Sequence, residues 1–333
     1  MSSLNRTKLP KYRITLKSNR KTHLYRLAHS LFLSRFLRPA LPHLNGNERQ
    51  LVEWTTALGE SPESALDRFK TAGLLVPFSS TGDDMLASAI HAIYGVAELK
   101  AMLKSRALKL SGKKNELVVR LLAADSHGIA REIGNLGLFH CSRDGAQLAA
   151  VFEARKEEAQ RNAIAAIEAK DYAHAILQYQ ALENDLGFPK WEFERAPSPA
   201  FIELVMTVNP RIVTGCSAEV LARLRCAMAL QCIAGRHAPR QILAGINTGM
   251  RLDAETAARM IFFLARHIED TRQWRELGVR FVAHFAGPGA CSICTALNGK
   301  KWSIDEAPEL PSAECSNDDL GCRCLYQPII DNH

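Results

Sequence analysis

The stretch that decides the fold of this protein is GVAELKAMLKSRALKLSGKKNELVVRLLAAD, which runs from Gly95 to Asp125. Apolar residues recur at helical spacing in both halves of it, while the middle is polar and contains a glycine. The apolar positions are Val96, Leu99, Leu103, Leu117, Leu121 and Leu122. The pattern predicts two amphipathic helices joined by a short turn.

The turn, Ser111-Gly112-Lys113-Lys114, has the features of a phosphate-binding site. We expect Ser111 to cap the second helix and Gly112 to let another chain approach closely. Unpaired N–H groups at a helix start attract anions, and the helix dipole adds to this attraction. The predicted nucleic-acid-binding residues are Lys104, Arg106, Lys109, Ser111, Gly112, Lys113, Lys114 and Arg120. The alternative is a structural hairpin whose lysines only face water.

This stretch, within residues 88–125, resembles the SAP family, whose pattern is LK..L...GL..SGKK..L..RL. The matching positions are Leu99-Lys100, Leu103, Leu108, Ser111 to Lys114, Leu117, Arg120 and Leu121. The resemblance implies binding to DNA, or sometimes RNA, mainly through the backbone and with low sequence specificity. It departs at Ala107, where the family usually has glycine. An alanine in a left-handed conformation is strained, so we expect this turn to differ slightly from that of the family.

Composition and charge favour a folded protein with an anionic partner. The chain has 333 residues, 47% hydrophobic composition and a net charge of +7. Ten lysines and arginines precede Leu44, and the first acid is Glu48, so the remainder carries 7 − 10 = −3. This basic arm suits counterion release at a phosphate backbone, or it is a solvated tail. The amphipathic segment 22–36 is also compatible with a membrane surface or a transit peptide.

The sequence predicts a mainly α protein with several helical segments and a short β-rich tail. The sequence contains no run of about 18 apolar residues, the length needed for a transmembrane helix. The expected compartment is a bacterial cytoplasm. We expect two helices over 48–58 and 62–73, and longer helices over 144–168, 217–233 and 253–268. The predicted segments are a basic arm (1–47), a helical hairpin and loop (48–87), the SAP-like motif (88–125), a helical region and linker (126–199), a helical domain (200–286) and a Cys-rich tail (287–333).

Five of the nine cysteines lie in the last 43 residues, as Cys291, Cys294, Cys315, Cys322 and Cys324. An odd number of cysteines without a secretion signal argues against a disulfide framework. A C-x2-C pair followed by a C-x-C pair is typical of a structural zinc site with four thiolate ligands. We expect Cys291, Cys294, Cys322 and either Cys315 or Cys324 to bind Zn2+. An iron–sulfur cluster or metal-free thiols are the alternatives.

The tail also resembles the C-terminal motif of Mu-like phage head morphogenesis proteins. The shared features are the C-x2-C pair, the Asn298-Gly299-Lys300 turn, two prolines and the closing Cys322-Arg323-Cys324. Cys315 and residues 317–321 stand where that family usually has a histidine. The resemblance suggests a phage-related or mobile-element origin.

No familiar catalytic pattern is present: the chain lacks GxGxxG, GxxxxGK[ST], HExxH and GxSxG. We therefore favour a non-enzymatic protein that binds DNA, with RNA as a possible ligand, and that contacts an unidentified protein partner. The alternatives are a phage structural or assembly protein and a nuclease with an unrecognised active site.

Overall fold

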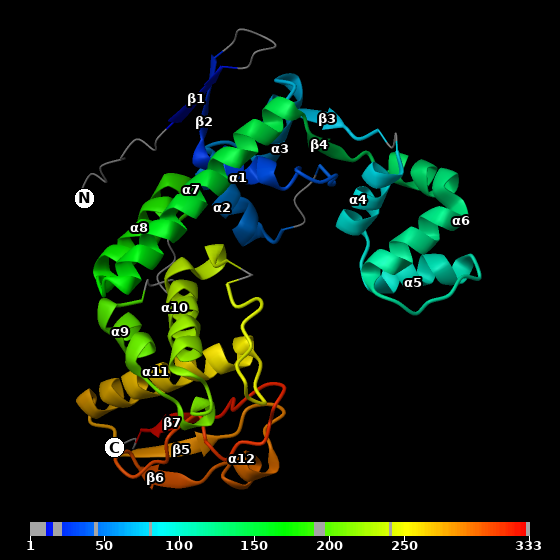
Figure 1. Cartoon of the computed structure of the whole chain (residues 1–333). Helices are drawn as coiled ribbons and strands as arrows, with labels where there is room; N and C mark the ends of the chain where they lie inside the picture. Colours follow the sequence, from blue (N-terminus) through cyan, green and yellow to red (C-terminus); the bar gives the residue numbers. More distant parts are fainter. Residues whose placement is uncertain are drawn as a thin grey trace. The chain divides into compact units, whose positions relative to one another are not determined.

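A computed structural model of the chain describes residues 11–15, 22–42, 46–79, 82–189, 197–239 and 242–330. These residues form twelve α-helices and seven short strands, which confirms the prediction of a mainly α protein (Figure 1). Close contacts divide the chain into two compact units. The first comprises Met1–Glu157 and Ala181–Glu192, and the second comprises Glu158–Gln180 and Phe193–His333.

The first unit begins with an antiparallel hairpin of β1 (Lys11–Thr15) and β2 (Thr22–Arg26), followed by α1 (Leu27–Ser34). Part of the predicted basic arm, residues 1–10, 16–21 and 43–45, lies outside the described residues. From Leu27 onward the structure differs from that prediction, because α1 is a core helix. Its apolar side chains pack against aromatic residues of the next helices. The free energy gained by burying these side chains outweighs the preference of the neighbouring basic residues for water.

Two predicted helices follow with the expected boundaries. α2 (Glu48–Leu58) ends at Gly59 in a left-handed conformation, and α3 (Pro62–Thr71) begins after Ser61, whose hydroxyl accepts the Ser64 N–H. β3 (Leu75–Pro77) then pairs with β4 (Phe139–Cys141), which leads into α7 (Arg143–Glu168). A Cβ on Gly145 would lie 2.0 Å from the Leu74 carbonyl oxygen, so only glycine lets α7 start this close to β3.

A buried polar network joins α1 to α3. The His29 ring is 3% exposed, and its Nδ1 accepts the Arg26 backbone N–H at 2.9 Å. Its Nε2 lies 3.2 Å from a Glu60 carboxylate oxygen that also pairs with Arg68. Burial and the nearby Arg68 charge lower the pKa of His29 from 6.5 to about 4, against the opposing effect of Glu60. His29 is therefore neutral in the folded protein.

We expect His29 to make the fold sensitive to acid. The unfolded chain takes up a proton below pH 6.5, whereas folded His29 resists protonation until about pH 4. Stability from this group is therefore complete above pH 6.5 and falls between pH 6.5 and 4, by ~3 kcal/mol at most. Urea unfolding across this range should show a steeper loss for wild type than for His29→Gln. A matched change of exposed His127 to Gln should keep the wild-type slope, and equal slopes for all three proteins would contradict the prediction.

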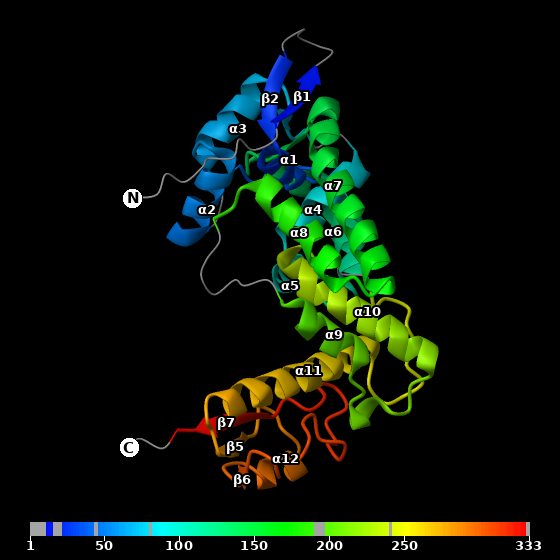
Figure 2. The same cartoon turned by 90° about the vertical axis from the view of Figure 1, so that its left-hand side faces the viewer.

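The motif-bearing part of the first unit has a core of its own. It consists of α4 (Asp83–Ile93), α5 (Val96–Ser105) and α6 (Lys114–Gly134), which lie together in Figures 1 and 2.

Within the described residues, no single helix is both long enough and apolar enough to cross a membrane. The only pair that passes is α4 with α5, which are bent by 117°.

The second unit contains the rest of α7, most of α8 (Tyr172–Leu186) and three further helices. These are α9 (Pro199–Thr207), α10 (Ala218–Ala234) and α11 (Ala254–Glu276), which contact one another. Asp253 caps α11 by accepting the Thr256 N–H at 2.7 Å. The tail adds β5 (Phe281–Phe285), α12 (Ser292–Ala296), β6 (Lys301–Ser303) and β7 (Leu325–Ile329), with antiparallel strand order β6-β5-β7.

Candidate nucleic-acid interface and metal centre

The helix–turn–helix predicted from the leucine spacing is present as α5 and α6. Leu99 and Leu103 of α5 and Leu117 and Leu121 of α6 are all fully buried in one core. Residues outside the motif complete this core from two sides. They are Leu86, Ala89 and Ile90 of α4 and Ile129 and Ile133 beyond the motif. The hairpin is therefore held rigidly enough to present its turn at a fixed position.

The turn between the helices uses two left-handed residues. Gly112 has a φ of +133°, which glycine adopts without strain. Ala107, the position that departs from the SAP pattern, has a φ of +55°. This left-handed conformation is strained for alanine, because its Cβ crowds the backbone.

Replacing Ala107 with glycine is expected to stabilise the protein. The left-handed conformation costs an L-residue roughly 1–2 kcal/mol, and glycine adds roughly 0.5–1 kcal/mol of unfolded-state entropy. The net gain should be about 0.5–1 kcal/mol, measured by urea unfolding. As a control, Ala101→Gly on the exposed face of α5 should destabilise by about 1 kcal/mol. A loss of stability in Ala107→Gly would contradict this account.

The start of α6 differs from the prediction in its cap. The capping position is Lys113 and not Ser111, and the Ser111 side chain caps no helix. Instead, the Glu116 carboxylate accepts the Lys113 backbone N–H at 3.3 Å. Ser111 lies two positions before the capping residue, so its hydroxyl is too early in the chain to cap α6. The first-turn N–H groups of α6 still lack intrahelical acceptors, as at any helix start.

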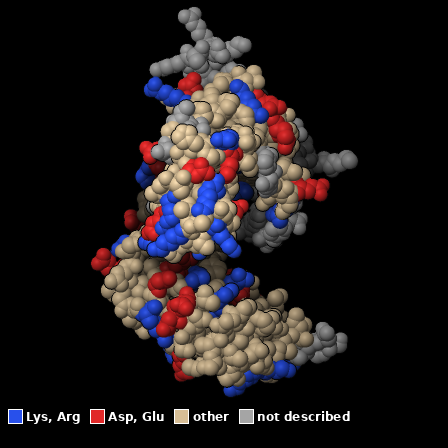
Figure 3. Space-filling model, turned by 90° about the vertical axis from the view of Figure 1, so that its right-hand side faces the viewer, with Lys and Arg blue, Asp and Glu red and all other residues tan. Residues whose placement is uncertain are grey.

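The structure separates the predicted cations into two groups. Lys104, Lys109 and Lys113 are exposed, and their side chains form no hydrogen bond or ion pair with the described residues. In contrast, Lys114 donates to the His91 carbonyl oxygen at 2.9 Å, and Arg120 donates to the carbonyl oxygens of Lys109 and Ser111 at 2.7 and 3.1 Å. Figure 3 shows lysines and arginines gathered over the part of the surface where α5 and α6 lie.

Arg106 also has internal partners. Its guanidinium contacts Asp125 at 3.2 Å and Glu132 at 2.9 Å. Asp125 interrupts the helical backbone of α6 and accepts the Gly128 N–H at 2.9 Å. Together these contacts tie the end of α5 to the bend in α6. Arg106 and Arg120 therefore fix the shape of the hairpin, while the three exposed lysines supply free positive charge at its tip.

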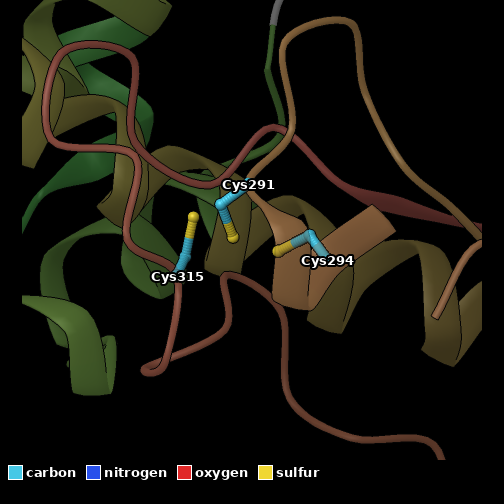
Figure 4. Close-up of side chains that lie close together, drawn as sticks. All are labelled: Cys291, Cys294 and Cys315. Carbon is cyan, nitrogen blue, oxygen red and sulfur yellow. The ribbon is translucent and has the colours of Figure 1, made fainter. Parts of the chain in front are cut away.

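The five tail cysteines form one cluster of buried or half-buried thiols. The sulfurs of Cys291, Cys294 and Cys315 lie within 4.8 Å of one another, and so do those of Cys294, Cys322 and Cys324. Figure 4 shows the first three side chains converging, with Cys294 projecting from α12 and the other two from flanking loops. Cys294 alone belongs to both groups. The cluster can therefore hold a metal ion, with Cys294 at its centre.

The thiols differ in how readily they ionise. Burial opposes ionisation of Cys291, but N–H groups of Cys294 and Ser316 and the neighbouring thiols lower its pKa to about 6. Burial raises the pKa of Cys294, and it raises that of Cys315 to about 11. Thiolates crowded in a buried space repel each other and lose hydration. A bound cation would offset both costs, which is the behaviour of a metal site.

The loop that carries Cys315 is anchored to the start of α11. Arg251 donates to the Cys315 carbonyl oxygen, and Thr256 donates to the Asp319 carbonyl oxygen at 3.3 Å. The Asn317 amide donates to the Gly289 carbonyl oxygen at 2.8 Å, joining the loop to the segment before α12. These contacts hold the two ends of the cysteine-rich segment together before any ion binds. Sequence reasoning missed them, because none of these residues carries a recognisable motif.

Comparison with known proteins found one family, the SAP domain, which matches residues 96–126. No curated protein and no solved structure matched the chain. The similarity of the tail to phage head morphogenesis proteins gained no support and stays a hypothesis. The matched stretch starts with α5, contains the whole turn and ends within α6, at the place where the leucines and lysines predicted it. Residues 96–126 of this chain are therefore a SAP domain, and the domain indicates that the protein binds nucleic acid.

Proposed function

We propose that this protein is a non-enzymatic DNA-binding protein whose SAP turn contacts the phosphate backbone with low sequence specificity. The observation that carries the proposal is a set of three exposed lysines: Lys104 in the last turn of α5, Lys109 in the connection and Lys113 at the capping position of α6. Lysine and helix N-terminal contacts to phosphate position a protein without reading its sequence. A cytoplasmic location is part of the proposal.

The remaining candidate residues have supporting roles in this proposal. Arg120 holds the turn closed by donating to two of its carbonyl oxygens. Lys114 is half-buried and uses one N–H on His91, which leaves its other N–H groups to face a phosphate. A Cβ on Gly112 would lie 2.5 Å from a Glu116 carboxylate oxygen, so glycine at this position makes room for the side chain that caps α6. Ser111 is exposed and contributes a hydroxyl at the edge of the site.

The experiment is a fluorescence titration of the full chain with two duplexes of equal length and unrelated sequence, and with an RNA duplex. Affinity for both DNA duplexes should be similar and should fall steeply with salt, because binding releases condensed counterions. Salt-independent binding, or a strong preference for one sequence, would overturn the proposal. Incubation of plasmid DNA with Mg2+ should leave it intact, whereas cleavage would favour the nuclease alternative.

We further propose that the ion held by the cysteine cluster is zinc in a structural role. Four thiolates suit tetrahedral Zn2+ and leave no open position for chemistry. The tail contains little apolar core, so a metal would supply stability that packing does not. Elemental analysis of the purified protein distinguishes zinc from iron, and iron with a visible absorption band would favour an iron–sulfur cluster.

A further inference from the structure

The outer face of the tail sheet is open and apolar, although its other face is covered. On the central strand β5, Val282 and His284 are buried, whereas Phe281 and Phe285 are 45% and 43% exposed. Leu325 on β7 is 47% exposed and pairs with Phe285, and half-buried Ile329 pairs with Phe281. Two rings therefore stand on the same face of one strand, about 13 Å apart along it.

A polar row separates the two rings. Ala283 lies between them on β5 and pairs with Lys301 on one side and Gln327 on the other. Lys301 and Gln327 are both exposed, and the small Ala283 side chain leaves a floor between the rings. A pocket of about 360 Å3 opens beside this row, lined by Phe281, Lys301, Trp302, Ser303 and Ile329.

The charge on this face has one sign. None of the residues in β5, β6 and β7 is acidic, and Lys301 carries a positive charge at the middle of the face. This charge complements a polyanion.

We propose that this sheet face binds a single-stranded segment of nucleic acid, with unpaired bases stacked on Phe281 and Phe285 and a phosphate beside Lys301. Aromatic rings on an open surface accept any base, because every base has a π-face, and a lysine beside them neutralises the backbone. The Gln327 amide, with a donor and an acceptor, suits the edge of a base. The proposal rests on the nucleic-acid role proposed above, but it uses different residues in the other unit.

A protein partner is the competing occupant of an apolar face. The three strands carry two exposed rings, a lysine and an amide, but no acidic residue, and this combination favours a polyanion. A purely apolar partner would leave Lys301 desolvated and unpaired. The two occupants make different predictions for a conservative change. Leucine in place of phenylalanine keeps the apolar surface but removes the stacking plane.

The test measures binding of the full chain to labelled oligo-dT and to a duplex of the same length. The variants are Phe281→Ala/Phe285→Ala, Phe281→Leu/Phe285→Leu, and Leu277→Ala as a control at another exposed apolar site, 79% exposed. Each lost ring should weaken oligo-dT binding by about 10-fold, with duplex affinity unchanged. The leucine variant should be weakened similarly, and Leu277→Ala should bind as wild type. Because all three sites are exposed, circular dichroism should show unchanged folding.

Ultraviolet crosslinking to a 4-thiothymidine oligonucleotide gives a second readout, and the crosslinked peptide should contain β5. Unchanged oligo-dT affinity in the alanine variant would overturn the proposal, as would wild-type affinity in the leucine variant. Altered self-association without loss of oligo-dT binding would also overturn it and would assign the face to a protein. A Lys113→Glu variant, run in parallel, should bind the duplex about tenfold more weakly than wild type. Failure of that control alone would count against the SAP proposal and not against the sheet.

Discussion

Changing Lys104, Lys109 and Lys113 together to glutamate is expected to weaken duplex DNA binding at least on the order of 100-fold in 0.1 M salt. Each phosphate contact releases about 0.9 counterion, which favours binding by about tenfold at this salt concentration. Loss of three contacts therefore has a larger effect than any loss of packing at the surface. Filter binding or fluorescence anisotropy with a short duplex measures it.

The fold should survive these changes. All three side chains are exposed, and Lys113 precedes the first residue of α6, where a glutamate interacts favourably with the helix dipole. The matched control is Lys170→Glu, an equally charged change at an exposed residue between α7 and α8. Single reversals at Lys113 and Lys170 should differ about tenfold in their effect on affinity. Equal effects would mean that net charge, and not the SAP turn, controls binding.

The second large effect is expected from Cys294→Ser. Cys294 is fully buried and is the only cysteine shared by both groups of close thiols. Its loss should remove the zinc and with it the metal's contribution to folding of the tail. Elemental analysis should show zinc falling from stoichiometric to near background. Trypsin should then cut the tail at Lys300, Lys301 and Arg323 much faster than in wild type.

Variants of other cysteines serve as controls for this result. Cys216→Ser changes a half-buried thiol in the same unit but outside the cluster, so its zinc content and protease resistance should match wild type. Cys291→Ser and Cys324→Ser each affect one group only and should lose less zinc than Cys294→Ser. If Cys294→Ser retains wild-type zinc, or if the tail resists trypsin in strong chelator, the metal proposal fails.

The sequence predicted the elements whose signals are local. α2, α3, α10 and α11 begin at a capping residue followed by apolar residues at helical spacing, and the structure places each within one residue of its predicted start. The SAP hairpin was predictable for the same reason, since its leucines and its turn all lie within 31 residues. The β-rich character of the tail was also predicted, and the structure forms it as three antiparallel strands.

Features that depend on distant residues could not be predicted. β3 pairs with β4 across more than 60 residues of chain, and both are only three residues long, too short for an alternating pattern. The role of α1 as a core helix depends on aromatic residues of α2 and α3. The basic residues around it therefore suggested a free arm when the segment was considered alone.

The candidate site shows the same division. Spacing identified the lysines of the turn and the five cysteines, but not which of them have partners within the fold. Arg106 is drawn toward Asp125 and Glu132, and the latter lies 26 residues away. Arg120 donates to main-chain carbonyl oxygens. Because every residue has such an oxygen, the sequence gives no signal for which one an arginine contacts. Of the six predicted cations, Lys104, Lys109 and Lys113 are exposed without a hydrogen bond or ion pair among the described residues, whereas Arg106, Lys114 and Arg120 have partners within the fold.

Contact of Lys104, Lys109 and Lys113 with phosphate is tested most directly by the salt dependence of binding. The measurement is the slope of log K against log salt concentration for wild type and for the triple alanine variant on one duplex. The variant's slope should be shallower by about 2.7, which is 0.9 for each lost contact. Parallel slopes for the two proteins would contradict it, whatever their difference in affinity.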